Sequence, residues 1–271
     1  MVPKVNQIYN KDCLEGMKDI PDNYIDLTVT SPPYDDLRKY QGYSFDFENI
    51  AKQLYRITKS GGVVVWVVMD STIKGSESGT SFRQALYFME TGFNLHDTMI
   101  YRCHKPPLTH NRYEQGFEYM FVLSKGTPKT FNPIIKRNKY RGENCLRNGD
   151  WASGKDNSAM RQREGEKSVK ECSIIENVWT YQTGGNKSTQ DSIAFRHPAI
   201  FPEKLVHDHI ISWSNEKDLI LDPFMGSGTT AKVAKILDRH FIGFEISKEY
   251  CDDAEKRIAS TLEQNKLKKW F

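Results

Sequence analysis

The amino-acid sequence predicts an α/β fold in which a mostly parallel sheet carries helices on both faces. Two observations lead to this prediction. Strand-like and helix-like stretches alternate in the N-terminal and the C-terminal part of the chain, which is typical of βαβ units. In the C-terminal part, a buried strand also leads directly into a glycine turn and a helix, as in sheets that bind nucleotide-like ligands at the carboxyl ends of their strands.

The N-terminal part begins this alternation. Hydrophobic spacing predicts strands at residues 25–30, 63–69, 95–102 and 118–124, and helices at residues 47–58 and 82–90. The first helix has Ile50, Leu54 and Ile57 on one face, and we expect Gly61 and Gly62 to close it. In the C-terminal part the same spacing predicts helices at 203–213, 229–237 and 248–267, and strands at 218–221 and 241–245.

Between residues 125 and 178 the periodic pattern is absent, and the segment is too long for a plain connecting loop. Residues 125–170 contain twelve lysines and arginines and five acids, whereas the whole chain has a net charge of +3. A segregated basic stretch is typical of a surface that binds a polyanion. We therefore divide the chain into residues 1–124, 125–178 and 179–271. The candidate DNA contacts are Lys136, Arg137, Lys139, Arg141, Arg147, Arg161 and Arg163.

The C-terminal glycine turn lacks the residues that bind phosphate. It consists of Asp222, Pro223, Phe224, Met225, Gly226, Ser227, Gly228 and Thr229. Gly228 is followed directly by Thr229 and not by a lysine, and no third glycine is present, which excludes a P-loop and a dinucleotide fingerprint. The next predicted strand ends at Glu245, an acid suited to ribose hydroxyls. These features favour S-adenosylmethionine, which has a ribose but no phosphate.

A second motif, Ser31-Pro32-Pro33-Tyr34, directly follows the first predicted strand. Two prolines fix the backbone and remove two donors, so that their carbonyls become rigid acceptors. An exocyclic amine of a base is a poor nucleophile because its lone pair is conjugated into the ring. Acceptors at Ser31 Oγ and the Pro32 carbonyl would bind the amine hydrogens and free this lone pair. Tyr34 would stack on a base taken out of the duplex.

Together these motifs resemble those of the DNA amino-methyltransferases of restriction–modification systems. Their order, with the Ser-Pro-Pro-Tyr motif early and the glycine turn late, resembles the circularly permuted beta class. The resemblance implies a Rossmann-like sheet of seven strands, mainly parallel with one antiparallel strand, and a target-recognition region at residues 125–178. It implies S-adenosylmethionine as cofactor and double-stranded DNA as substrate. It leaves open a cognate restriction endonuclease as partner and a monomeric or homodimeric state.

Two further segments match this class. Residues 197–205, which include His197 and Phe201, resemble the segment that lines the methionine end of the cofactor. Asp12 and Cys13 resemble the segment where an acid meets the adenine amine. The predicted cofactor-binding residues are thus Asp12, Cys13, Thr30, His197, Phe201, Asp222, Pro223, Phe224, Gly226, Ser227, Gly228, Thr229 and Glu245. The predicted catalytic residues are Ser31, Pro32, Pro33 and Tyr34.

The methylated base follows less directly from the motifs. In the family, a serine before Pro-Pro-Tyr is more typical of cytosine-N4 enzymes and an aspartate of adenine-N6 enzymes, so Ser31 favours cytosine, with adenine as the alternative. Cytosine-C5 methylation needs a nucleophilic cysteine, in that family within a Pro-Cys motif, and none of the five cysteines follows a proline. The basic segment and the permuted order argue against RNA, protein or small-molecule methylation.

The composition indicates a cytoplasmic protein. The longest apolar run, residues 63–69, is too short to span a bilayer. The N-terminal residues lack the apolar core of a signal peptide. The five cysteines form no C-x-x-C pair, which argues against a disulfide framework and a zinc ribbon. We therefore expect neither a membrane segment nor a metal site.

Overall fold

The computed structural model divides into two compact units, residues 1–132 with 177–271 and residues 133–176. The residues that it describes are 2–33, 45–103, 113–139, 141–142, 144–146, 150–152, 161–163, 166–168, 170–182, 184, 187–189, 191–197 and 199–264. Within this part of the chain, no helix is long and apolar enough to cross a membrane.

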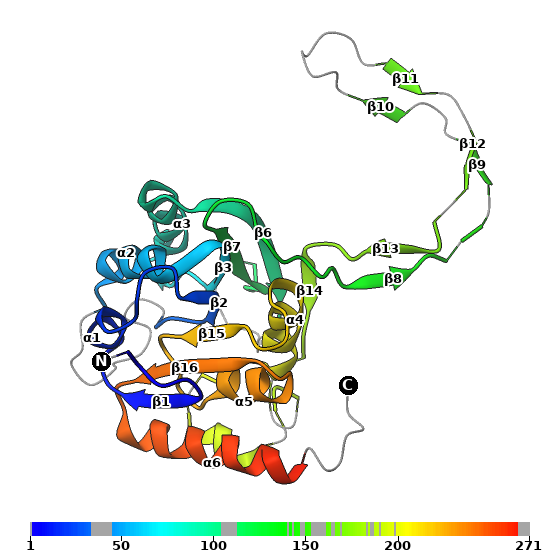
Figure 1. Ribbon diagram of the computed structural model, residues 1–271. Helices are drawn as coiled ribbons and strands as arrows, with labels where there is room; N and C mark the ends of the chain where they lie inside the picture. Colours follow the sequence, from blue (N-terminus) through cyan, green and yellow to red (C-terminus); the bar gives the residue numbers. More distant parts are fainter. Residues whose placement is uncertain are drawn as a thin grey trace. The chain divides into compact units, whose positions relative to one another are not determined.

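The first unit is built on an eight-stranded sheet with the order β1-β16-β15-β2-β3-β7-β6-β14 (Figure 1). Its strands are β1 (Gln7–Asn10), β2 (Ile25–Thr30), β3 (Thr58–Val68), β6 (Asn94–Arg102), β7 (Phe117–Ser124), β14 (Val178–Thr180), β15 (Leu219–Asp222) and β16 (His240–Glu245). Strand β7 is antiparallel to both its neighbours, and the other neighbouring pairs are parallel. The predicted fold class is confirmed. The sheet has eight strands where the resemblance implied seven, because β14 pairs with β6.

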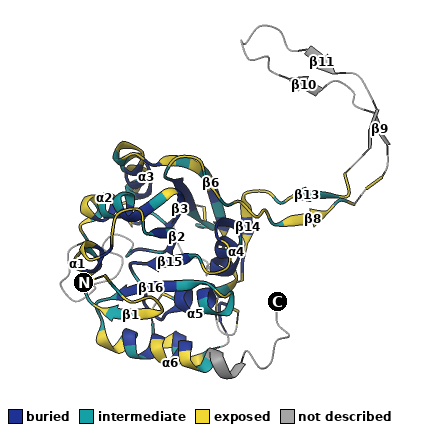
Figure 2. Ribbon diagram, viewed as in Figure 1, coloured by how far each residue is buried: buried dark blue, intermediate teal, exposed yellow. Residues whose placement is uncertain are grey.

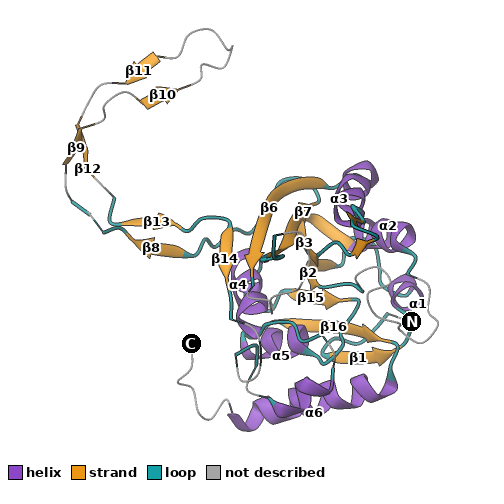
Figure 3. Cartoon of the chain, turned by 180° about the vertical axis from the view of Figure 1, so that it is seen from behind, coloured by secondary structure: helices purple, strands orange, loops and turns teal. Residues whose placement is uncertain are grey.

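Helices cover both faces of this sheet (Figures 1 and 3). One layer consists of α1 (Cys13–Lys18), α2 (Phe47–Ile57) and α3 (Thr80–Thr91), which pack side by side. The other layer consists of α4 (Glu203–Trp213), α5 (Thr229–Ile236) and α6 (Lys248–Gln264). A short 3-10 helix, η2 (Ser192–Arg196), contacts α6, and a small hairpin, β4 (Thr72–Ile73) and β5 (Ser76–Glu77), precedes α3.

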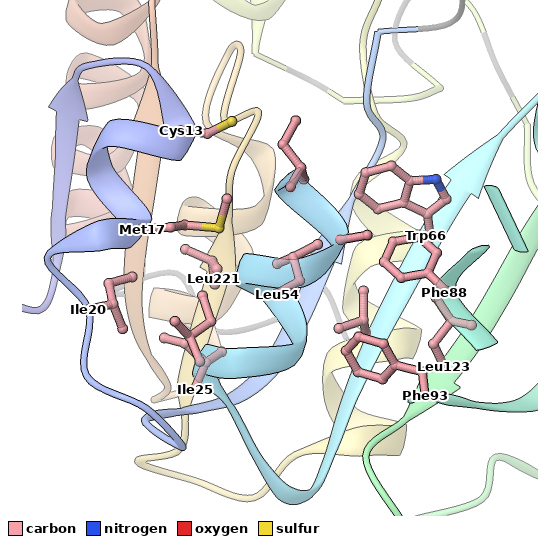
Figure 4. Packing of buried hydrophobic residues seen from close by; sticks show 14 of the residues in the cluster. Cys13, Met17, Ile20, Ile25, Leu54, Trp66, Phe88, Phe93, Leu123 and Leu221 are labelled. Atoms are coloured by element: carbon pink, nitrogen blue, oxygen red, sulfur yellow. The ribbon is translucent and has the colours of Figure 1, made fainter. Parts of the chain in front are cut away.

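The central strands are buried on both faces, as Figure 2 shows for β2, β3 and β15. Under the first helix layer the core is rich in aromatic rings (Figure 4). Trp66 of β3 is fully buried, and its Nε1 donates to Gln84 Oε1 at 2.8 Å, so its one polar atom is satisfied. Phe88 packs edge-on against Trp66 with ring centroids 5.1 Å apart. Phe224 follows strand β15, and its ring centroid lies 6.1 Å from that of Trp66.

One local prediction was wrong, and two short elements were missed. Gly61 and Gly62 do not close α2, because the helix already ends at Ile57 and both glycines lie within β3. The hydroxyl of Thr58 donates to the Leu54 carbonyl at 2.6 Å and ends the last turn, and the Gly61 N–H donates to the Lys125 carbonyl. Strand β1 and helix α1 were not predicted at all, because four and six residues are too few to show a period.

The second unit consists of three short antiparallel ladders. Strands β8 (Ile135–Arg137) and β13 (Cys172–Ile174) pair first, then β9 (Asn144–Leu146) with β12 (Glu166–Ser168), then β10 (Asp150–Ala152) with β11 (Arg161–Arg163). The pairs are nested along the sequence, which is the pattern of one long interrupted hairpin. The unit, residues 133–176, lies inside the predicted segment 125–178.

Asparagines flank this unit on both sides and belong to the first unit. Asn132 donates its N–H to the Ser212 carbonyl at 2.9 Å and its side-chain amide to the carbonyls of Ile211 and Ser214. Asn177 donates its side-chain amide to Asp97 Oδ1 at 3.1 Å, and its carbonyl accepts from the Ile100 N–H. The chain is thus held by a side-chain amide directly before and directly after the second unit.

The packing of helix α1 against strand β16 can be tested by substitution. A Cβ on Gly16 would lie 2.1 Å from the Phe244 ring. Gly16→Ala should therefore lower the free energy of unfolding by roughly 1–3 kcal/mol, although alanine normally favours a helix. Chemical denaturation measures the change. Phe244→Leu in the same chain should recover part of the loss, and a Gly16→Ala protein as stable as the parent would contradict the close contact.

Candidate functional site

The predicted site residues come from both ends of the sequence, and the sheet brings many of them to one edge. Because β1, β16, β15 and β2 are parallel neighbours, their carboxyl ends lie at the same edge. The segments that leave this edge begin at Lys11, Ile246, Pro223 and Ser31. The structure therefore brings together the predicted residues of the Asp12 segment, the glycine turn, Glu245 and the Ser31 segment.

The carboxyl ends of the neighbouring strands β15 and β2 also mark a topological switch point of the sheet. From β15 the chain passes through α5 to β16 on one side, and from β2 it passes through α2 to β3 on the other. These two helices belong to opposite layers. Open α/β sheets bind ligands at the carboxyl ends of strands at such a point. Asp222 and Thr30 are the last residues of these two strands.

A buried hydrogen bond connects the two strands there. Thr30 Oγ1 donates to Asp222 Oδ1 at 2.6 Å, and the Phe224 N–H donates to the same oxygen at 3.0 Å. Burial raises the pKa of Asp222 to about 6, against the opposing effect of the hydrogen bond from Thr30. The Asp222 carboxyl thus fixes the start of the glycine turn relative to the end of β2.

Glu245 holds the same turn from the other side. Its Oε2 accepts from the Gly226 N–H and its Oε1 from the Ser247 N–H, both at 2.8 Å. Burial raises the pKa of this carboxyl as well. Glu245 therefore has a structural role in addition to the predicted role as ribose ligand. Truncating it to alanine would loosen the turn itself.

The two glycines of the turn face different neighbours. Gly226 has a φ of +50°, and a Cβ placed on it would lie 3.0 Å from His197 Nε2. Gly228 has a φ of +80°, and a Cβ there would lie 2.6 Å from the Ala254 Cβ in α6. Both conformations favour glycine. Gly228 thus serves helix packing, whereas Gly226 faces the predicted cofactor segment.

His197 lies over this turn together with a residue that the sequence did not single out. The His197 ring contacts the Tyr250 ring edge-on, with centroids 4.5 Å apart. Its Nδ1 lies 2.7 Å from the Ala199 carbonyl, within the same loop. Tyr250 lies in the first turn of α6, five residues after Glu245. This closeness to Glu245 in the sequence is the one signal that could have identified it as a site residue. Phe201 is half-buried in the segment that leads into α4.

At the other end of the site, Asp12 begins α1. Its Oδ1 accepts from the N–H groups of Leu14 at 2.9 Å and Glu15 at 3.3 Å, so it acts as the N-cap. Cys13 is buried, and burial raises the pKa of its thiol to about 12. A thiol with this pKa stays protonated at neutral pH and is no nucleophile.

The Ser-Pro-Pro segment leaves β2 at the switch point. Pro32 is buried, and Ser31 and Pro33 are half-buried. Tyr34 lies outside the described residues. Phe224, predicted to contact the cofactor, packs against Trp66 and Phe45 and thereby joins the site to the aromatic core.

The predicted DNA contacts belong to the second unit. Lys136 and Arg137 lie in β8 and form ion pairs with Glu176 and Glu171, and Lys139 and Arg141 are exposed. Arg161 and Arg163 lie in β11, and Arg147 falls outside the described residues. Among the side chains that the structure describes, no group of three or more histidines, cysteines or carboxylates could hold a metal.

The pKa of Asp222 generates a prediction about stability. A carboxyl whose pKa rises on folding stabilises the protein below its unfolded pKa, and this contribution is lost as the pH rises through about 6. The stability of the parent relative to Asp222→Asn should thus fall by on the order of 2 kcal/mol between pH 4 and pH 7.

Urea unfolding of both proteins across this pH range measures the difference. Asparagine keeps an acceptor for Thr30 and Phe224, so the turn should persist in the variant. Thr30→Val removes the hydrogen bond that favours the carboxylate and should move the inflection to higher pH. Parallel pH profiles for parent and Asp222→Asn would refute the raised pKa.

Comparisons with known proteins show the family and the fold of the chain. The orphan methyltransferase M.BamHII of Bacillus amyloliquefaciens is 57% identical over 251 residues, which cover 89% of this chain and 91% of the relative. The solved structure of PvuII DNA methyltransferase (cytosine-N4-specific) matches with a TM-score of 0.68 at 21% identity, over 97% of this chain and 93% of that one. The complex of M1.HpyAVI with SAM matches with a TM-score of 0.60 at 24% identity, over 93% and 98% of the two chains. A family model described as "N6_N4_Mtase: DNA methylase" matches residues 25–256, and the chain therefore belongs to this DNA methylase family.

Proposed function

We propose that the protein is a site-specific methyltransferase that moves a methyl group from S-adenosylmethionine to the N4 amine of cytosine in duplex DNA. The observation that carries this proposal is the Thr30–Asp222 hydrogen bond, which holds the Ser-Pro-Pro segment beside the glycine turn. A direct transfer requires that the groups holding the base and those holding the methyl donor lie side by side. The name of M.BamHII supports a methyltransferase, and the name of the cytosine-N4-specific PvuII enzyme supports the choice of base.

The charges at the site fit the proposed cofactor. Asp222 and Glu245 place two carboxylates at the turn, which suits a cationic ligand that also has ribose hydroxyls. The first lysine after the turn, Lys232, is buried and donates to Asp191 and Glu203, both at 2.7 Å. It is therefore engaged away from the position where a phosphate-binding lysine would act. A sulfonium compound without phosphate matches this set of groups.

The chemistry of the residues follows from their positions. S-adenosylmethionine, when bound, supplies an electrophilic methyl group on its sulfonium. Ser31 Oγ and the Pro32 carbonyl would accept hydrogen bonds from the cytosine amine, drawing its lone pair out of the ring towards the methyl group. With the amine held by these two acceptors, its nitrogen would take the methyl group from the sulfonium, which would leave as a neutral thioether, and one amine proton would pass to solvent. The Pro-Pro backbone provides rigid orientation, so most of the acceleration would come from positioning and electrostatics.

Duplex DNA is the substrate that the second unit favours. Its nested antiparallel strands form a two-stranded ribbon, and the major groove of B-DNA admits such a ribbon. Arg137, Lys139 and Arg141 are exposed along it. Exposed cations on a ribbon suit contacts with phosphates, which position a protein on the duplex.

The base assignment is tested with purified protein, labelled S-adenosylmethionine and duplex DNA. After digestion to nucleosides, mass spectrometry should detect N4-methylcytosine. N6-methyladenine instead would support the alternative base, because an adenine amine fits the same acceptors. Label in RNA and none in duplex DNA would refute the proposal. Sequencing DNA from cells that express the protein would then give the recognition site.

The Ser31 and Tyr34 variants test the catalytic assignment. Ser31→Ala should lower turnover without abolishing it, because the Pro32 carbonyl remains. Tyr34→Ala loses a stacking contact worth roughly 1–3 kcal/mol and should lose most activity, whereas Tyr34→Phe keeps the ring and should retain much of it. Methylation assays with parallel cofactor titrations are the measurement, and cofactor affinity should stay nearly unchanged. If Tyr34→Phe is as impaired as Tyr34→Ala, the stacking role is wrong.

The basic ribbon makes a separate prediction. If Arg137, Lys139 and Arg141 contact phosphates, replacing all three with glutamine should weaken DNA binding and reduce the slope of log K against log [salt] by about 2–3. Fluorescence anisotropy between low and moderate salt measures the slope. The exposed lysines Lys18, Lys52 and Lys248 of the first unit provide a control triple variant with the same loss of charge. Equal slopes for the two triple variants would contradict a ribbon contact.

A further inference from the structure

A buried arginine contacts the glycine turn from the side of α6. Arg257 is only 1% exposed. Its Nη1 donates to the Ser227 carbonyl, to Ser227 Oγ at 3.0 Å and to Thr229 Oγ1 at 3.3 Å. One nitrogen of the guanidinium thus holds the two residues on either side of Gly228.

The other nitrogens of Arg257 hold a second segment. Nε donates to Asp191 Oδ2 at 3.1 Å, and Nη2 donates to Glu203 Oε1 at 2.9 Å. Asp191 and Glu203 flank the stretch that contains His197 and Phe201. The same guanidinium therefore connects the glycine turn to the segment that lies over it.

Lys232 completes this cluster and balances its charge. Its ammonium lies 2.7 Å from Asp191 Oδ2 and 2.7 Å from Glu203 Oε1, so that two cations face two anions. Burial acts to raise the pKa of Asp191, but hydrogen bonds and ion pairs with Lys232 and Arg257 outweigh it and hold the pKa below its usual value. Buried ion pairs add little net stability, since desolvation offsets the attraction. Their clearer effect here is to fix one arrangement of the two segments.

We propose that Arg257 is a positioning residue for the cofactor, which sets the separation between the glycine turn and the segment carrying His197. A guanidinium presents five donors in a planar fork, and here the fork reaches Ser227 on one side and Asp191 and Glu203 on the other. A lysine carries its donors on one nitrogen and cannot reach both segments in this way. The inference rests on the proposed use of S-adenosylmethionine.

The test compares two conservative variants. In Arg257→Lys the charge remains and the fork is lost. Arg239→Lys is the matched control, because Arg239 also uses its fork on a serine and on carbonyls, donating to Ser214 Oγ, the Ser214 carbonyl and the Leu237 carbonyl. Arg239 precedes β16 and therefore lies at the opposite edge of the sheet from the site.

Calorimetry with S-adenosylmethionine, on proteins shown to be folded by circular dichroism, is the measurement. Arg257→Lys should weaken the cofactor Kd about ten- to hundredfold, the effect of losing one charge-assisted hydrogen bond or more. Both variants should lower the Tm, but Arg239→Lys should bind the cofactor within about twofold of the parent. Affinity for duplex DNA without cofactor should be the same in all three proteins.

The outcomes separate the two proposals. If the parent fails to bind S-adenosylmethionine, the proposed function falls. If the parent binds it and Arg257→Lys binds equally well, only the positioning role falls. Equal losses of cofactor affinity in Arg257→Lys and Arg239→Lys would also overturn it, because the effect would then follow stability alone. If Arg257→Lys does not fold, Glu203→Gln removes one charge of the cluster and should weaken cofactor binding in the same direction, while unchanged affinity in Glu203→Gln would refute the role.

Discussion

The hydrogen bond from Thr30 Oγ1 to Asp222 Oδ1 is the contact on which the rest of the site depends. These two residues end neighbouring parallel strands although 192 positions separate them in the sequence. Parallel pairing forces their carboxyl ends to one edge, and the change in winding direction leaves that edge between two helix layers. The Asp222 carboxyl then fixes Phe224, and through Phe224 the turn is joined to Trp66 in the core. The Asp222 carboxyl thus connects the candidate site to the aromatic core.

Most regular elements of the first unit could be predicted from the sequence because their apolar residues recur with a clear period. Strand β2 and helix α4 begin and end at the predicted residues, and Gly92 ends α3 with a positive φ as expected for a C-terminal cap. The failures have a local cause. Four residues in β1 show no period, and the Gly61-Gly62 pair indicated a helix end where the chain had already entered β3.

The site was only partly accessible to the same reasoning. Motifs near Ser31 and Gly226 are contiguous, so their residue types indicate their chemistry directly. The Arg257 cluster is not contiguous. Its members come from the 3-10 region, α4, α5 and α6, and each alone looks like an ordinary surface charge in an amphipathic helix. Only the tertiary packing of these elements shows that Arg257 and Lys232 are buried. Glu245 was similarly assigned a ligand role, while its hydrogen bonds to the Gly226 and Ser247 backbone could not be foreseen.

The asparagines that flank the second unit have a consequence for how this unit can vary. Asn132 and Asn177 bind backbone and side-chain groups of the first unit, and none of those partners lies between residues 133 and 176. The hydrogen bonds of these two asparagines therefore do not depend on which residues stand between them. A different stretch between Asn132 and Asn177 would meet the same hydrogen bonds at each end. If this unit contacts DNA as proposed, a change in its sequence would alter the DNA contacts while the Thr30–Asp222 hydrogen bond stays as it is.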